Sequence, residues 1–371
     1  MNTPELDYLT IKGFKSIASI EKLALRPINV VIGPNGSGKS NFIGVFSFLH
    51  AIREGRLQDY VRKAGGAENL LHFGSKATQE IVIRVSFLEE VNQYYLILKP
   101  SGDDSLYPAI EIVSFWDKHH PQPYTDSLAS RENGREAGIS NPDLKRTPDW
   151  VRTRLGRWRL YHVHDTSESS PMRKTAQLND NAYLRPDGSN LPAFLYLLKV
   201  KHPDSYGLIR RSIQQVTPFF DDFTLAPDAL NESTIRLAWK HKHSDQYFGA
   251  AAISDGTLRF ITLATLLLQP AQYHPSVIVV DEPELGLHPT AITFLAAMVK
   301  QASQQTQVIL STQSSLLLDH FEPEDVLVAE RVDGGTTFQR LDTERLASWL
   351  EEYSLGQLWE KNELGGRPRK E

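Results

Sequence analysis

The segment from Gly33 to Ser40 has residue types and a spacing suited to holding phosphates. It fits G-x-x-x-x-G-K-[ST], a pattern in which backbone N–H groups of a glycine-rich loop surround the phosphates of a nucleotide. Lys39 is expected to reach the β- and γ-phosphates, and the Ser40 hydroxyl to bind Mg²⁺. The motif therefore predicts ATP and Mg²⁺ as cofactors. The residues predicted to bind the nucleotide are Asn35, Gly36, Ser37, Gly38, Lys39 and Ser40.

The neighbours of this loop support the same interpretation. Ile28–Ile32 is a short apolar run typical of a buried strand, and residues 41–49 have the pattern of the first turns of a helix. A strand, a glycine loop and a helix N-terminus direct N–H groups and a positive dipole end toward an anion. A chance glycine-rich turn would not be expected to have both flanks.

An apolar run, residues 277–280, ends in two acids, Asp281 and Glu282. A buried strand would bring both carboxylates to the carboxyl edge of a parallel sheet, where nucleotides bind. Asp281 is predicted to hold Mg²⁺, and Glu282 to orient or deprotonate the attacking water. Taken alone, this pattern fits a surface acidic turn equally well, but behind a phosphate-binding loop it favours ATP hydrolysis.

Two further segments frame the acids. Ser254, Asp255 and Gly256 open an apolar helical pattern, in which Ser254 is a candidate N-cap and Gly256 leaves room for a phosphate. Residues 284–289 follow the acids directly and read ELGLHP.

In this order, the motifs resemble those of the ABC-type ATPase heads of the SMC and RecF class. Ser254 to Gly256 resemble the signature motif, residues 281–282 the Walker B acids, and residues 284–289 the D-loop. The opening residues 11–16, IKGFKS, resemble the first strand of such heads. More narrowly, the chain resembles the short stand-alone bacterial ATPases grouped as AAA-21-like, many of which are found in anti-phage defence operons.

The resemblance implies a mechanism and partners. Two subunits would meet head to tail as a homodimer or within a higher oligomer, with ATP between the phosphate loop of one and the signature of the other. Ser254, Asp255 and Gly256 would thus complete the site of the partner subunit. Because this sequence shows no nuclease constellation of its own, the resemblance implies a separate effector, a nuclease or toxin, acting in trans.

The chain departs from the family pattern in two places. Gln313 stands where such heads often carry a histidine that senses the γ-phosphate; glutamine can form hydrogen bonds there but cannot take up a proton. We therefore assign Gln313 to the catalytic site and expect slow hydrolysis. The usual Q-loop glutamine is also missing. Residues 164–167, HDTS, are a candidate replacement, although a plain polar loop after an edge strand explains them as well.

The expected fold class is α/β: an N-terminal mixed β lobe, a mostly parallel sheet flanked by helices, an inserted irregular or helical lid, and no long coiled coil. Single strands are expected at Trp158–Val163 and Thr234–Trp239. The expected parts are 1–115 (first half of the head), 116–205 (insertion or lid), 206–342 (second half of the head) and 343–371 (C-terminal helix and basic tail).

The 371 residues are 40% apolar and 23% charged, with a net charge of −5 and no cysteine. This composition suits a globular protein without disulfides or thiolate metal sites. No apolar run reaches membrane-spanning length, and the polar start of the chain does not resemble a signal peptide, so a cytoplasmic protein is expected. Residues 131–159 hold eight basic side chains and two tryptophans; this stretch suits contact with a nucleic-acid backbone or, equally well, a charged solvated surface.

Four functions remain in competition at this stage. The first is an ATP-driven switch that controls an effector, and the second is a recombination or repair ATPase that clamps DNA directly. The third, the ATPase subunit of a membrane transporter, is disfavoured by the missing Q-loop and the proline-rich insertion. The fourth, a nucleotide-binding scaffold without turnover, is disfavoured by Glu282.

Overall fold

The computed structural model describes residues 5–365, so the predicted basic tail at 366–371 lies outside the described residues. The strands are β1 (Leu6–Phe14), β2 (Ile17–Ala24), β3 (Ile28–Ile32), β4 (Ile81–Phe87), β5 (Asn92–Pro100), β6 (Leu106–Phe115), β7 (Tyr124–Ser127), β8 (Trp158–Tyr161), β9 (Ala176–Gln177), β10 (Phe220–Thr224), β11 (Pro227–Asp228), β12 (Asn231–Ile235), β13 (Ala238–His241), β14 (Tyr247–Gly249), β15 (Val277–Asp281), β16 (Gln307–Thr312), β17 (Val326–Val332) and β18 (Gly335–Arg340). The helices are α1 (Lys39–Arg53), α2 (Leu57–Lys63), α3 (Arg146–Leu155), α4 (Leu191–Lys201), α5 (Pro203–Val216), α6 (Asp255–Leu268), α7 (Pro289–Ala302), α8 (Ser315–Leu318), α9 (Thr343–Leu350) and α10 (Leu355–Lys361).

A central sheet with the strand order β18-β17-β3-β16-β15-β8 joins the two halves of the chain. Its strands run parallel except β18, which pairs antiparallel with β17. The predicted, mostly parallel sheet is thus confirmed. Since the carboxyl ends of β3, β15 and β16 meet at one edge, the phosphate loop and the two acids lie at that edge.

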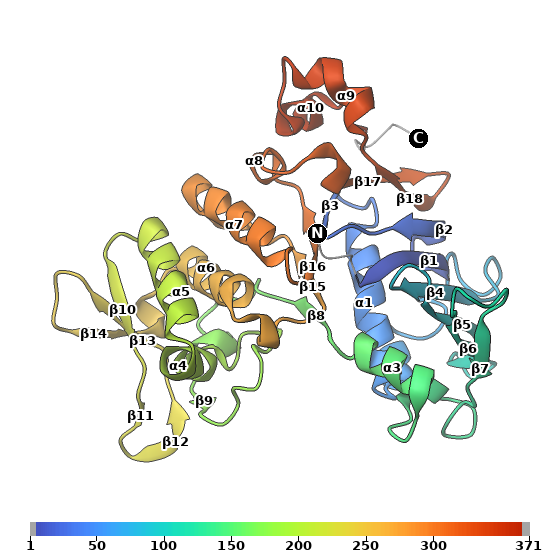
Figure 1. Cartoon of the computed structure of the whole chain (residues 1–371), viewed down its shortest axis with the longest axis horizontal. Helices are drawn as coiled ribbons and strands as arrows, with labels where there is room; N and C mark the ends of the chain where they lie inside the picture. The colour runs from blue at the N-terminus through green and yellow to red at the C-terminus, as the bar shows by residue number, and fades with distance from the viewer. Residues whose placement is uncertain (1–4, 366–371) are drawn as a thin grey trace.

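Both faces of this sheet are buried, as its continuous apolar strands require. Along β3, Val30 and Ile32 pack into one hydrophobic core while Val31 packs into the other. The second core also takes in α1 and a six-stranded antiparallel sheet, β2-β1-β4-β5-β6-β7, which forms the lobe on the right of Figure 1. No described helix approaches the length of a coiled coil, since the longest, α1, has 15 residues.

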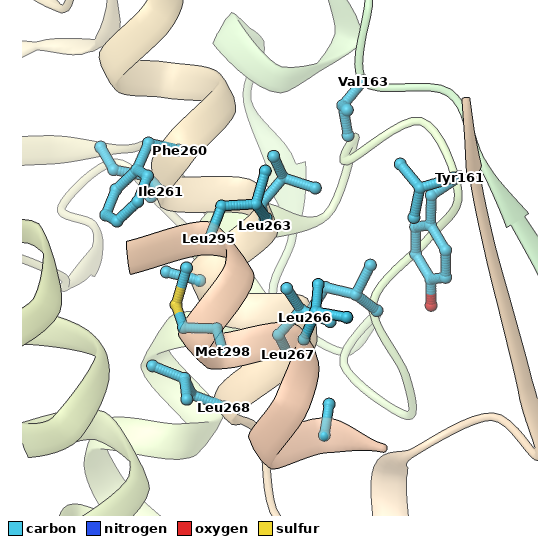
Figure 2. Packing of buried hydrophobic residues seen from close by; sticks show 14 of the residues in the cluster. Tyr161, Val163, Phe260, Ile261, Leu263, Leu266, Leu267, Leu268, Leu295 and Met298 are labelled. Carbon is cyan, nitrogen blue, oxygen red and sulfur yellow. The ribbon is translucent and has the colours of Figure 1, made fainter. Parts of the chain in front are cut away.

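The other core belongs to the helical lobe on the left of Figure 1. Helix α6 is buried on all sides from Leu258 to Leu268, and only its first turn is accessible to solvent. Figure 2 shows Leu263, Leu266 and Leu267 of α6 close to Leu295 and Met298 of α7, with Tyr161 at the end of β8 nearby. This packing fixes the first turn of α6 relative to the central sheet.

Three expectations about elements differ from the structure. The range 116–205 does not form one insertion, because β8 pairs with β15 as the edge strand of the central sheet. The single strand expected at Thr234–Trp239 is two strands in different sheets, β12 and β13, with buried Leu237 between them. The C-terminal helix is two helices, α9 and α10, since Ser354 and Gln357 form a capping box that starts α10.

Candidate functional site

The phosphate loop connects β3 to α1 in a conformation that depends on glycine. Gly36 and Gly38 have φ values of 81° and 102°, in the left-handed region that disfavours other residues. Gly38 is the N-cap of α1, so the free N–H groups of the first helical turn open onto the loop. The arrangement provides a positive, donor-rich concavity.

Gly38→Ala is expected to lower the free energy of unfolding by about 2–5 kcal/mol, because both the left-handed backbone and a steric clash oppose the new methyl group. A Cβ at position 38 would lie 2.1 Å from Thr336 Oγ1 on β18. Gly36→Ala is the matched control: its φ is also positive, but a Cβ there meets nothing within 4 Å. Its cost should therefore stay near ~1–2 kcal/mol. Equal losses in urea denaturation of the two variants would contradict the clash.

The Lys39 side chain is buried beneath the loop. Its ammonium donates hydrogen bonds to the carbonyl oxygens of Gly33, at 2.6 Å, and Pro34, at 3.0 Å. Burial lowers the pKa of Lys39, while Glu282, Asp281 and Glu284 act in the opposite direction. The phosphate loop and the acids at the end of β15 therefore lie within electrostatic reach of one another.

The two predicted catalytic side chains, Glu282 and Gln313, are in contact. Residue 281 is the register partner of Ser311 in the parallel pair β15–β16, so the chain after each strand emerges at the same place. The Gln313 amide Nε2 donates to Glu282 Oε1 at 2.5 Å. Glu282 itself has a φ of 41°, and its backbone N–H donates to the carbonyl oxygen of Ser311. A left-handed non-glycine residue is costly, and this one aims its carboxylate at the sheet edge.

Glu284 holds the segment that carries Gln313 through two hydrogen bonds. Its Oε1 accepts hydrogen bonds from the Thr312 hydroxyl and, at 3.4 Å, from the Gln313 backbone N–H. Burial raises the pKa of Glu284, and the hydrogen bond from Thr312 partly offsets that effect. Glu284 is thus placed to hold the Gln313 segment rather than to face solvent.

The oxygen donors at this edge suit a hard divalent cation. Asp281 and Ser40 supply a carboxylate and a hydroxyl, the ligand types that Mg²⁺ prefers. The Asp281 carboxylate accepts no hydrogen bond from any residue in 5–365, so its lone pairs are available. No group of three or more acidic, histidine or cysteine side chains in the described chain gathers as a closed metal cage. The remaining ligands of Mg²⁺ would therefore be water and phosphate oxygens.

The signature residues lie at the start of α6. Ser254 caps α6 by accepting a hydrogen bond from the Thr257 N–H at 3.3 Å, and Ser254 and Asp255 are exposed. Within residues 5–365, no hydrogen bond or ion pair joins them to the phosphate loop. Gly256 packs against the D-loop so closely that a Cβ there would lie 2.4 Å from the Gly286 carbonyl oxygen.

Two arginines that sequence reasoning missed hold the signature in place. Arg259 donates from Nε to the Val163 carbonyl oxygen at 2.9 Å and from its η nitrogens to that of His164 at 3.0 Å. Arg173 pairs with Asp255 at 2.7 Å and donates to the carbonyl oxygen of Ile253. One indication of Arg259 was present in the sequence, a charged residue inside the apolar pattern of α6. Nothing in the sequence indicated the role of Arg173.

The candidate Q-loop follows β8, beside the acids. The Arg259 side chain on α6 donates a hydrogen bond to the carbonyl oxygen of His164, the first residue of this segment. Asp165 accepts hydrogen bonds from the Ser167 N–H and hydroxyl. Burial lowers the pKa of the nearby His162, and the charge of Asp281 acts in the opposite direction. The segment thus links the signature helix to the Walker B edge, and its role as a Q-loop replacement stays a prediction.

The sequence profile of the AAA_21 family, described as "AAA domain, putative AbiEii toxin, Type IV TA system", matches residues 28–95 and 126–319. This match covers more than half of the chain and includes every segment of the site. The chain belongs to the AAA_21 family. Its α/β fold is that of an SMC ATPase head, as the resemblance of its motifs predicted.

Curated relatives of this AAA_21 protein include chromosome partition proteins Smc. Those of Mycolicibacterium paratuberculosis and Mycobacterium tuberculosis are 41% and 40% identical to it over 63 residues. The match covers 15% of the chain and 5% of each relative, so the chain spans only a small part of the length of these proteins.

Solved structures of SMC heads share the fold over nearly the whole chain. An SMC head bound to the C-winged helix domain of ScpA has a TM-score of 0.60 at 15% identity, covering 93% of this chain and 100% of that one. A head from Pyrococcus furiosus with an extended coiled coil, bound to the C-terminal domain of ScpA, has a TM-score of 0.58 at 14% identity, covering 94% and 99%. At these identities the likeness shows the fold. Among residues 5–365, no helix is both long and apolar enough to cross a membrane.

Proposed function

We propose that this AAA_21 protein is a cytoplasmic ATP-dependent dimer switch whose subunits meet head to tail. Lys39 and the loop N–H groups bind the phosphates, Asp281 and Ser40 hold Mg²⁺, and Glu282 activates the attacking water. Glu282 accepts a hydrogen bond from Gln313, which cannot exchange protons at neutral pH, so turnover is slow. ATP binding favours the dimer, and hydrolysis releases it.

One observation carries this proposal: among residues 5–365, the signature is exposed and has no hydrogen bond or ion pair to the loop of its own subunit. Ser254 and Asp255 are exposed, and the contacts of Arg173 and Arg259 hold the segment rigidly. A preorganised polar helix start without a ligand in its own chain suits the site of a second copy. Leu285 in the adjoining D-loop, with an exposed fraction of 50%, would lie in the same interface.

Mixing two inactive variants tests the shared site. Lys39→Ala removes the phosphate lysine, and Ser254→Arg blocks the signature; each variant alone should be inactive. A mixed dimer pairs the intact loop of one subunit with the intact signature of the other. Random mixing should therefore restore about a quarter of the wild-type ATPase rate, because half of the dimers are mixed and each has one of two sites.

The control mixture combines Lys39→Ala with the double variant Lys39→Ala/Ser254→Arg, which has no intact loop in any pairing and should stay inactive. Phosphate release at equal total protein measures both mixtures. If the first mixture is as inactive as its components, the two motifs do not act across a dimer.

We further propose that the switch controls a separate effector, a nuclease or toxin, in bacterial anti-phage defence. The description of the family, which names a toxin and a toxin–antitoxin system, supports this context. Affinity purification of the tagged chain from its native host should recover a protein partner in amounts that change with Glu282→Gln. Recovery of no stable partner would weigh against effector control.

The relatives favour one alternative, a recombination or repair ATPase that clamps DNA itself. The matched proteins are named for chromosome partition, although the match spans 5% of their length. Binding of DNA by the purified chain alone, dependent on ATP and falling steeply with salt, would favour this alternative over effector control.

A further inference from the structure

A cluster of arginines surrounds His50 near the end of α1. Arg53 and Arg56 come from the end of α1 and the turn after it, Arg152 from α3, and Arg159 from β8. Burial lowers the pKa of His50, Glu54 opposes this effect, and the charges of Arg159, Arg53 and Arg56 reinforce it. The four guanidinium groups therefore lie close enough to act on one imidazole or on one another.

Most of this positive charge is not neutralised by the protein. Glu54 pairs with Arg56 and, at 3.1 Å, with His50. Arg53, Arg152 and Arg159 have no carboxylate partner within residues 5–365. Arg53 and Arg159 instead donate to backbone carbonyl oxygens, that of Arg152 at 3.3 Å and that of Trp158 at 2.8 Å. Four arginines with Glu54 as their one paired acid in the described chain repel one another, and a bound anion would relieve this repulsion.

A cleft of about 570 Å³ opens beside this cluster, between α1, α2 and β8. Three cations, Arg56, Lys63 and Arg159, and one acid, Asp59, line it. Of the aromatic lining residues, Tyr60 is partly exposed, whereas Phe46 and Trp158 are almost fully buried. The volume lies in the range of sites for small molecules and nucleotides. Three cations beside the partly exposed ring of Tyr60 suit a ligand that has both a phosphate and a planar group.

Three buried polar atoms at this cleft have no hydrogen-bond partner among the described residues: His50 Nδ1, Arg152 Nε and Trp158 Nε1. Buried polar atoms are almost always paired, so each unpaired one requires an explanation. His50 and Trp158 line the cleft, and Arg152 lies in the charge cluster beside it. Because these atoms are closed to solvent, a ligand in the cleft would reach them only after neighbouring side chains move.

The cleft is separate from the phosphate loop. His50 follows Lys39 by eleven residues on the same helix, a rise of about 17 Å along its axis. The cleft nevertheless adjoins the ATP site at its far end, because His162, which also lines it, interacts electrostatically with Asp281.

We propose that this cleft is a second binding site, for a phosphate-bearing small molecule of nucleotide size that acts as an effector of the ATPase. Arg159, Lys63 and Arg56 bind the phosphate, and the ring of Tyr60 contacts the rest of the ligand. Because α1 begins at Lys39 and β8 leads to His162, occupancy of the cleft is transmitted to both parts of the ATP site.

Calorimetric titration of the full chain with inorganic pyrophosphate and with AMP tests this site. The Lys39→Ala background weakens the phosphate loop, so the second site dominates. We expect saturable binding in this background, weakened about tenfold or more by Arg159→Ala or Lys63→Ala, each of which removes one charge-assisted contact. Lys12→Ala is the control: it also removes one lysine charge, but Lys12 pairs with Glu21, and neither residue lines the cleft.

The possible outcomes distinguish a small phosphate-bearing ligand from a nucleic acid. Binding of either probe that Lys12→Ala leaves within twofold and that Lys63→Ala lowers supports the site. A 12-nucleotide single strand that binds through Arg159 and Lys63 while pyrophosphate and AMP do not would overturn the proposal in favour of a nucleic-acid surface. Equal binding by all variants, or binding of no probe, would also overturn it. Lys63 is exposed, so Lys63→Ala remains informative if Arg159→Ala does not fold.

Discussion

Glu282→Gln is expected to retain ATP binding while lowering the rate of ATP hydrolysis by about 10²- to 10⁴-fold. The carboxylate emerges at the end of β15, accepts the Gln313 amide at 2.5 Å and lies within electrostatic reach of Lys39. An amide at position 282 has the same size but cannot take the proton of the attacking water. Phosphate release over multiple turnovers measures the loss.

The same variant should accumulate in the ATP-bound dimer, because association no longer leads to hydrolysis and release. Size-exclusion chromatography with and without Mg-ATP would show a shift toward the dimer that is larger for Glu282→Gln than for the wild type. A variant that loses hydrolysis by failing to bind ATP would show no such shift, so the two measurements distinguish the causes.

Glu284→Gln is the matched control for this substitution. Glu284 lies two residues further on, and its Oε1 accepts hydrogen bonds from Thr312 and Gln313 that an amide oxygen can also accept. Burial already raises the pKa of Glu284, so a neutral side chain is well tolerated there. Hydrolysis should remain within several-fold of the wild type. The reverse result, with Glu284→Gln stalled and Glu282→Gln active, would assign the general base to Glu284.

The parts of the site that the sequence predicted are those built by local chemistry. The phosphate loop is one strand, one turn and one helix start, so residues 28–53 carry all the information needed to recognise it. Asp281 and Gln313 follow two apolar runs, and parallel pairing of these runs brings their ends together. The strand and loop patterns therefore placed the phosphate loop and the acids at one edge, and the family resemblance added Gln313.

What the sequence did not predict depends on contacts between distant segments. Arg259 bonds to the carbonyl oxygen of Val163, 96 residues away, and Arg173 to that of Ile253, 80 residues away. The basic stretch at residues 131–159 was open to two interpretations because some of its arginines pair with acids in the folded chain and others do not. Arg154 pairs with Glu5, whereas Arg152 and Arg159 join arginines of α1 around His50. Only the folded chain shows which charges are neutralised.

Lys39→Ala is expected to abolish measurable ATP binding, a loss of at least roughly 100-fold in affinity, because two or more charge-assisted contacts to phosphate disappear. The loss exceeds that of one ordinary contact for an electrostatic reason. Asp281, Glu282 and Glu284 all act on the Lys39 ammonium. Without the ammonium, a polyanionic ligand would face acidic side chains with only backbone N–H groups to hold it.

The thermal midpoint of unfolding gives a direct measurement. Saturating Mg-ATP should raise the midpoint of the wild type, since a ligand that binds only the folded state stabilises it, and should leave that of Lys39→Ala unchanged. Lys39→Met separates charge from packing, because it keeps the aliphatic stem beneath the loop and should lose the shift equally. Lys12→Ala, which removes an exposed lysine paired with Glu21, should keep the full shift. An ATP-dependent rise in Lys39→Met would mean that the lysine charge is not what holds the phosphates.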